Sequence, residues 1–172
     1  IKDIKVSILI NKFKKTNKIM NFAVSKSKGS IISWLGDDDY LNENTIKNVR
    51  KTFLKNNPKW LIGFGQYVDE NYNVTRSLMT SIKRFLLSNF NSNILLCINF
   101  IMTQSVFLKK NFFLKNGGWN YKNSHCNDYE AWLQFVKIST PYILRNTLSG
   151  STISSSTATG TFDFNRFKLI NK

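Results

Sequence analysis

The sequence predicts an α/β domain in which a mixed, mostly parallel sheet is flanked by helices. Apolar runs rich in β-branched residues alternate with amphipathic segments, which is the pattern of α/β folds. The length of 172 residues suits one domain with a sizeable core. Hydrophobic residues make up 42% of the chain and aromatic residues 14%, more than a disordered chain carries. We therefore expect one domain over residues 1–172.

The N-terminal part of the chain predicts a strand, a helix and a second strand. Ile4–Ile10 is rich in Ile and Val and predicts a strand. Asn17–Lys28 predicts a helix, because its apolar residues fall on one side and its lysines on the other. Gly29 ends this helix. Ser30–Leu35 then predicts a buried strand.

The next segments predict an amphipathic helix followed by a strand and a hairpin. Asn42–Asn56 has apolar residues at helical spacing, with Asn42 as a candidate cap and Asn57-Pro58 as the stop. Trp60–Val68 predicts a strand. Residues 69–73 are typical of a hairpin loop, after which the chain resumes at Val74.

The second half predicts further helices and strands, less regularly spaced. Leu78–Asn93 is ambiguous, with a basic helix expected around Ile82–Leu87. Phe100–Leu108 predicts a strand, and Lys109–Asn116 predicts a short helix that ends at two glycines.

The C-terminal part predicts one clear helix. Asn127–Ser139 carries four apolar residues on one face, and Tyr142–Leu148 predicts a final strand. Ser149–Thr161 is rich in Ser, Thr and Gly and predicts a loop, before a short basic, apolar tail helix over Phe162–Ile170.

The charge balance is strongly basic. Lys and Arg number 25 against 10 Asp and Glu, which gives a formal net charge of +15. Such a charge suits anionic partners, and Lys83-Arg84 and Lys109-Lys110 could meet diphosphate or anionic lipid. The alternative is compositional drift, because the lysines are scattered. We expect no nucleic-acid partner, since the aromatic residues lie mainly in apolar runs.

The cysteines predict neither a disulfide framework nor a zinc site. Cys97 lies in an apolar stretch and is expected in the core, and Cys126 follows the only histidine, His125. No stretch is long and apolar enough to span a bilayer. We expect a cytoplasmic protein, with peripheral contact at the inner face of the plasma membrane as a further expectation.

Three adjacent acidic residues, Asp37, Asp38 and Asp39, follow the predicted strand Ser30–Leu35 in a chain where acid is scarce. Adjacent carboxylates repel one another unless a cation or a donor-rich loop compensates. The carboxyl end of a strand is also where open α/β sheets bind ligands. The pattern therefore indicates a divalent-metal site for a phosphorylated substrate, or else an acidic turn that starts the next helix.

The order of several motifs resembles family 2 glycosyltransferases with the GT-A fold. The matching segments are the helix residues from Asn21 to Gly29, the strand with its acidic triplet, the strand and hairpin over 64–70, and three later motifs. These later motifs are Gln104-Ser-Val-Phe, Phe113-Leu-Lys-Asn-Gly-Gly-Trp119 and Asn127-Asp-Tyr-Glu-Ala-Trp-Leu. The resemblance covers roughly residues 17–137. It implies a metal-binding and nucleotide-binding part over 1–60, an acceptor half over 61–148, and a loop and tail over 149–172.

The chain departs from the family in three ways, one of which is Asn127, where many members carry Glu or another residue before the catalytic Asp. The family's N-terminal strand–helix–strand segment is missing before Ile4, so we expect an incomplete GT-A sheet. Gly36 stands where many members carry the first Asp of an Asp-X-Asp motif. The resemblance then implies that Asp38 binds Mg²⁺ or Mn²⁺ directly, with Asp39 assisting and Asp37 as a further candidate ligand.

The resemblance also implies the remaining site residues. Asp128 matches the family's catalytic base, with a helix-terminal role as the alternative. Asn21, Gln104 and Trp119 are the expected substrate-binding residues, although Gln104 and Trp119 also suit strand and core packing.

We expect the transfer of a sugar from a nucleotide-sugar donor to an acceptor hydroxyl on a glycan or a lipid-linked molecule. The reaction is expected to be inverting and metal-dependent, and to serve surface polysaccharide or glycolipid synthesis in a bacterial cell envelope. The alternatives are an inactive remnant that binds sugar or nucleotide, and a basic nucleic-acid-binding module.

Overall fold

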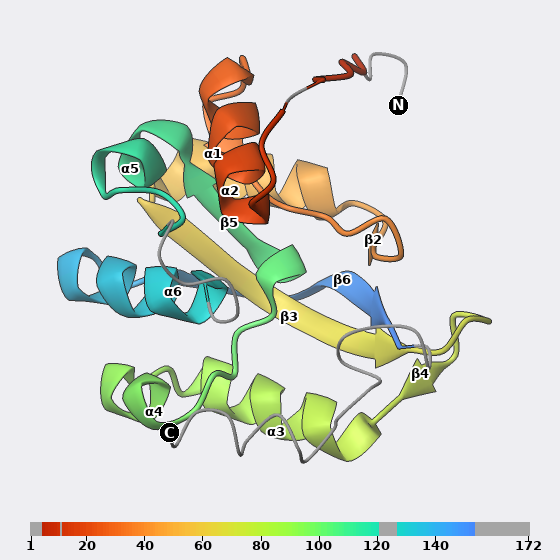
Figure 1. Cartoon of the computed structure of the whole chain (residues 1–172). Coiled ribbons are helices and arrows are strands. Elements are labelled where there is room, and N and C mark those ends of the chain that lie inside the picture. The colour runs from red at the N-terminus through yellow and green to blue at the C-terminus, as the bar shows by residue number, and fades with distance from the viewer. Residues whose placement is uncertain (1–4, 11, 121–126, 154–172) are drawn as a thin grey trace, which may run out of the picture.

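The predicted strand Trp60–Val68 is confirmed as β3 and lies at the centre of the sheet. The computed structural model describes residues 5–10, 12–120 and 127–153. Within them the strand order is β1-β5-β3-β6-β2, with the short β4 paired to β3 (Figure 1). Three consecutive β3 residues, Trp60, Leu61 and Ile62, are fully buried, which accounts for the continuous apolar run in the sequence.

The mixed α/β architecture is confirmed, and its parallel part is the pairing of β3 with β6. This pairing runs from Leu61 opposite Tyr142 to Val68 opposite Thr152 and is the most extended in the sheet. The shorter pairings are antiparallel, so the parallel share is smaller than expected. The other strands are β1 (Ile31–Ile32), β2 (Tyr40–Leu41), β4 (Val74–Thr75), β5 (Val106–Lys109) and β6 (Tyr142–Thr152).

The predicted helices that lie within the described residues form at nearly the expected bounds. The structure adds one helix, α4, and extends the ambiguous basic helix into α3. The α-helices are α1 (Thr16–Lys26), α2 (Thr45–Asn56), α3 (Ser77–Ser88), α4 (Ser92–Cys97), α5 (Lys110–Lys115) and α6 (Asn127–Ile138). Asn42 does not cap α2. Its backbone N–H and its side-chain amide donate to the carbonyls of Leu148 and Thr147.

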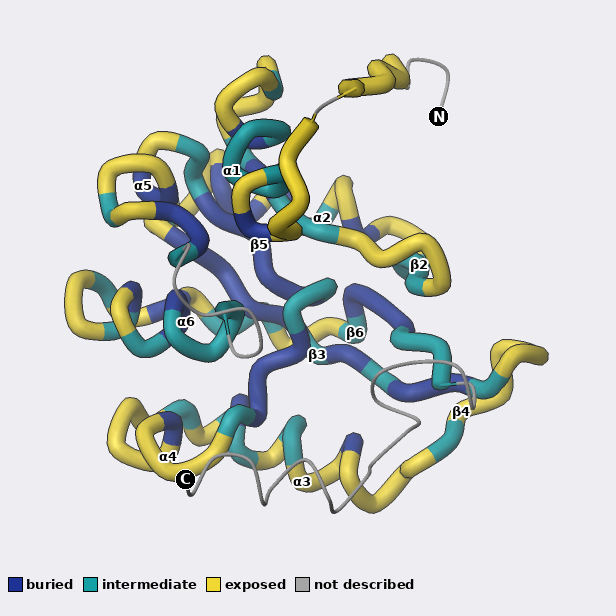
Figure 2. Tube along the Cα trace, viewed as in Figure 1, coloured by how far each residue is buried: buried dark blue, intermediate teal, exposed yellow. Residues whose placement is uncertain are grey.

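Alternate residues of the central strands face two different apolar clusters. Leu61 of β3 and Phe107 of β5 pack with α2 on one side of the sheet. Trp60 and Ile62 pack on the other side, where α1, α3, α4, α5 and α6 each contribute buried residues. Helix α2 is therefore separated by the sheet from the other five helices. Figure 2 shows the buried strands at the centre of the molecule.

The predicted strand Ile4–Ile10 is wrong for the residues that the structure describes. Residues 5–10 form no regular element, and Val6 and Ile8 are 81% and 87% exposed. Within the described chain no strand lies beside them, and an extended segment without a partner leaves its backbone groups to water.

The expected strand Phe100–Leu108 and the expected loop after Leu148 are also corrected. The first divides into a 3-10 turn, η1 (Thr103–Ser105), and β5. The second continues as strand to Thr152, because β6 stays paired with β3 as far as Thr152 opposite Val68, and the buried hydroxyls of Ser105 and Ser149 pair at 2.6 Å. Each of these two buried hydroxyl groups therefore has a hydrogen-bond partner, so burial of the serines is tolerated.

Other expectations fall at the surface or outside the described part. Cys97 is exposed at the end of α4, because Leu95 is the residue of that helix that enters the core. His125, Cys126 and the predicted tail helix lie outside the described residues. No helix within them is long and apolar enough to cross a bilayer.

Candidate functional site

The acidic triplet forms a tight turn after β1. The hydroxyl of Ser33 donates to the Val106 carbonyl at 2.8 Å and holds the outgoing chain against β5. The backbone N–H of Asp39 then donates to the Gly36 carbonyl at 3.3 Å, and the Gly36 N–H donates to Oδ2 of Asp39 at 3.2 Å. The turn therefore folds the Asp39 carboxylate back over Gly36.

Two of the three carboxylates converge above Gly36. Oδ2 of Asp39 and Oδ1 of Asp38 lie 2.7 Å and 2.9 Å from the point where a Cβ atom of residue 36 would stand. A side chain at residue 36 would displace both oxygens, so glycine permits this convergence of the two carboxylates. Asp37 is exposed, and the described residues contain no group of three or more His, Cys, Asp or Glu arranged to hold a metal. The arrangement is thus a pair of carboxylates and not a triad.

The turn η1 connects this pair to the predicted catalytic base. Gln104 donates through Nε2 to Oδ2 of Asp39 at 2.8 Å and to Oγ of Ser151 at 3.1 Å. The preceding residue, Thr103, donates through Oγ1 to Oδ2 of Asp128 at 2.8 Å. Adjacent residues of one short turn therefore hold two carboxylates that lie far apart in the sequence.

The sheet topology explains why these groups meet. β5 runs antiparallel to β1, so η1 at the start of β5 lies beside the end of β1. β6 runs parallel to β3, which brings Ser151 to the same end of the sheet. This is the edge formed by the carboxyl ends of β1, β3 and β6, where α/β sheets place ligands.

Helix α6 presents Asp128 from its first turn. The second carboxylate oxygen, Oδ1, accepts the N–H of Tyr129 at 2.7 Å. The Tyr129 hydroxyl in turn donates to the Leu95 carbonyl of α4 at 2.6 Å. Burial raises the pKa of Tyr129, and the nearby Cys97 thiol acts in the same direction. Trp132 is fully buried one turn further along and anchors the helix in the core.

Asn21 and Trp119 are paired with each other instead of being presented to solvent. Asn21 donates through Nδ2 to the Trp119 carbonyl at 2.8 Å and accepts the Trp119 N–H at 2.9 Å. The Trp119 side chain is 2% exposed, and its ring lies 4.7 Å from that of Trp34. Because the ring is buried, neither of its faces is open for stacking on a sugar. Trp119 is therefore a core residue, and Asn21 holds the Trp119 backbone through two hydrogen bonds.

Sequence reasoning missed a set of side-chain amides that joins α1 to α6. Asn17 donates to the carbonyl of Asn120 at 2.5 Å, and Asn127 donates to Oδ1 of Asn17 at 2.7 Å. Asn120 donates to Oε1 of Glu130 at 2.7 Å. The one available signal was the spacing of Asn17 and Asn21, which places two amides on one face of α1.

Thr103 and Ser151 were missed as well. Nothing in their local sequence marks them, since Thr103 lies within an apolar run and Ser151 within a Ser/Thr-rich one. Their role depends on the strand register, which local patterns do not contain.

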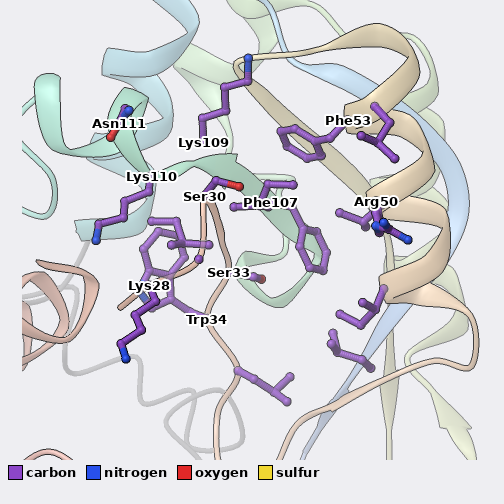
Figure 3. A pocket seen from close by; sticks show the side chains of 18 of the residues that line it. Lys28, Ser30, Ser33, Trp34, Arg50, Phe53, Phe107, Lys109, Lys110 and Asn111 are labelled. Carbon is purple, nitrogen blue, oxygen red and sulfur yellow. The ribbon is translucent and has the colours of Figure 1, made fainter. Parts of the chain in front are cut away.

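A further hollow in the described structure lies away from these carboxylates. It has a volume of about 1020 Å³ and lies along β1, between α2 on one side and Lys28 and Lys110 on the other (Figure 3). Its walls include Phe53, Phe107 and Trp34 but none of the site carboxylates. Lys110 donates through Nζ to the carbonyl of Ser27, which follows α1, at 2.6 Å. Its ammonium group therefore stabilises the C-terminal end of that helix. We place the candidate site at the acidic turn and not in this hollow.

Comparison with known proteins gives similarity in fold alone. No family model matches the chain, and no curated protein sequence matches it. The structure is similar to crystal structures of Staphylococcus aureus TarS, a glycosyltransferase. With TarS residues 1–349 in complex with UDP-GlcNAc, the TM-score is 0.65 at 15% identity, over 92% of this chain and 45% of that chain. With the UDP complex, the TM-score is 0.56 at 16% identity, over 82% and 41%.

The chain therefore has a glycosyltransferase-like fold and spans less than half the length of the TarS chains that it matches. The expectation of a glycosyltransferase-like α/β fold, made from the motif order, is confirmed at this level. Assignment to family 2, the division at residue 60 and the roles of individual site residues stay predictions.

Proposed function

We propose that the protein containing this chain transfers a sugar from a nucleotide-sugar donor to an acceptor hydroxyl. The observation that carries the proposal is the pair of hydrogen bonds from η1, which links Asp39 of the acidic turn to Asp128 of α6 through Gln104 and Thr103. Similarity in fold to a glycosyltransferase crystallised with UDP-GlcNAc and with UDP supports the choice of donor class.

Asp128 is proposed as the general base. A hydroxyl oxygen becomes a better nucleophile as its proton passes to a positioned carboxylate. Such general-base catalysis raises the reaction rate roughly 10²–10⁴-fold. The acceptor oxygen bonds to the anomeric carbon while the bond from that carbon to the diphosphate oxygen breaks. The proton passes to Asp128, and the electron pair leaves with the nucleoside diphosphate. A single displacement of this kind inverts the anomeric configuration.

Asp38 and Asp39 are proposed to hold a divalent cation on the diphosphate. Mg²⁺ and Mn²⁺ accept one or two carboxylates together with phosphate oxygens and waters, and the convergence of two carboxylates over Gly36 fits that donor set. The bound ion would supply charge neutralisation for the leaving diphosphate. Gln104 and the Gly36 N–H fix one Asp39 oxygen, so that carboxylate is oriented before the ion binds.

The test uses the full-length protein with UDP-GlcNAc and Mn²⁺, and measures release of UDP with and without acceptor glycans. We expect UDP release to require the metal. Asp38→Ala and Asp128→Asn should each abolish UDP release without loss of fold. Undiminished release by Asp128→Asn rejects Asp128 as the base. Binding of UDP-GlcNAc with no turnover under any condition favours the inactive binding module instead.

A further inference from the structure

The consecutive helices α3 and α4 lie along one border of the molecule (Figures 1 and 2). They carry a group of exposed apolar side chains. Leu78 and Phe85 are the most exposed members, at 75% and 68%. We name this surface the α3–α4 face and define it by the exposed residues Leu78, Met79, Ile82, Phe85, Ile94, Leu96 and Ile98.

Helix α3 packs into the core through Leu87, yet it leaves several large apolar residues exposed. Its two cations turn toward the sheet: Lys83 lies 5.4 Å from the Tyr67 ring centroid, and Arg84 donates to the Thr147 hydroxyl at 2.9 Å. Leu78, Ile82 and Phe85 follow the spacing i, i+4, i+7 and share the outer side. A helix with cations inward and apolar residues outward exposes a face suited to an apolar medium.

The two helices of this face carry no negatively charged side chain. The sequence contains no Asp or Glu between Glu70 and Asp128, so neither helix carries an acidic residue. Arg145 is exposed beside the last residue of α3 and donates to the Ser88 carbonyl at 3.3 Å. Together with the net charge of +15, two helices without acidic residues match a negatively charged surface.

We propose that the α3–α4 face binds the surface of an anionic phospholipid bilayer. Its apolar side chains enter the boundary between headgroups and acyl chains, as in amphipathic helices that lie in the membrane plane. Arg145, which is exposed beside the end of α3, is placed to meet lipid phosphates. The proposal concerns binding alone and stands whether or not the chain transfers sugar.

The face is tied directly to the candidate site. Tyr129 follows Asp128 in α6, and its hydroxyl bonds to the Leu95 carbonyl of α4. Bilayer binding through α4 would hold Asp128 at a fixed height above the lipid. If the proposed function holds, this geometry selects an acceptor that is itself attached to lipid.

The test is co-sedimentation of the full chain with vesicles of phosphatidylglycerol and phosphatidylcholine in equal parts, against vesicles of phosphatidylcholine alone. We expect sedimentation with the anionic vesicles, weakened at least about tenfold by the double variant Leu78→Gln/Phe85→Gln. The matched control is Ile46→Gln/Leu54→Gln on α2, across the sheet, where Leu54 is 74% exposed. The control variant should bind as the parent does.

Three results would overturn the proposal. These are absence of binding to anionic vesicles, equal binding to both vesicle types, and equal weakening by both double variants. If another part of this chain covers the face, Leu78→Gln/Phe85→Gln will lower the melting temperature. If a second copy covers it, the same variant will lower the molecular mass in solution. In both cases the parent chain will not bind vesicles. As a second readout, an environment-sensitive fluorophore on Cys97 in a Cys126→Ser background should shift to the blue on anionic vesicles only.

Discussion

The Thr103 hydroxyl donates a 2.8 Å hydrogen bond to Oδ2 of Asp128, across 25 residues of sequence. Because the next residue, Gln104, bonds to Asp39, the turn η1 orients both carboxylates of the candidate site. Thr103 is therefore a positioning residue for Asp128, and removal of its hydroxyl tests that role without touching either carboxylate.

Thr103→Val should lower kcat by about 10- to 100-fold with little change in KM for the donor, because a base displaced by about 1 Å loses its alignment with the reacting proton. Thr103→Ser keeps the hydroxyl and should retain activity near the parent level. Steady-state kinetics of both variants make the comparison. Equal kcat in Thr103→Val and the parent would show that Asp128 needs no such partner.

Gly36→Ala should disrupt the acidic turn specifically. The new Cβ would stand 2.7 Å from Oδ2 of Asp39 and 2.9 Å from Oδ1 of Asp38, so both carboxylates must move. Gly36 does not have a positive φ, and stability should therefore change little. We expect a higher Mn²⁺ concentration for half-maximal UDP release and an unchanged melting temperature. An unaltered metal dependence would place the cation elsewhere.

Trp119→Ala should act on stability. The ring is buried against Trp34, Phe113 and Trp132, and removal of a buried aromatic side chain costs about 3–5 kcal/mol. Urea denaturation measures the loss. Trp119→Phe should recover much of it. If Trp119 instead stacks on a sugar, Trp119→Phe will fold as stably as the parent and show a raised KM.

Tyr129 predicts an alkaline limit to stability. Its pKa is raised above the ordinary value of 10.0 by burial, so the folded chain holds this proton more tightly than the unfolded chain. The associated stabilisation is complete below that value and is lost as pH rises through the raised pKa. The free energy of unfolding should fall more steeply with pH, above pH 10.0, in the parent than in Tyr129→Phe. Parallel curves would contradict the assignment.

Much of the fold follows from local patterns. Trp60–Val68 and Asn127–Ile138 were predicted almost to the residue, because one is a continuous buried run and the other a regular amphipathic helix. The segment 5–10 has the same composition as a strand yet forms none. A strand is defined by its partner, and composition does not supply one.

The site was predicted in part for the same reason. The acidic turn and Asp128 are visible as motifs, but the link between them depends on β5 running antiparallel to β1. That register places Thr103 and Gln104 between the two carboxylates. For Trp119 the local sequence left substrate binding and core packing both open, and the structure favours core packing, with Asn21 bonded to the Trp119 backbone and the ring buried.

The central claim is that the acidic turn and the start of α6 form one nucleotide-sugar site. Paramagnetic broadening by Mn²⁺ in the presence of UDP-GlcNAc tests it most directly, with backbone amides observed by NMR. The account predicts that Asp38, Asp39, Gln104 and Asp128 broaden together and that Asp38→Ala removes the effect from all four. Broadening confined to the acidic turn while Asp128 stays sharp, or broadening that persists in Asp38→Ala, would contradict it.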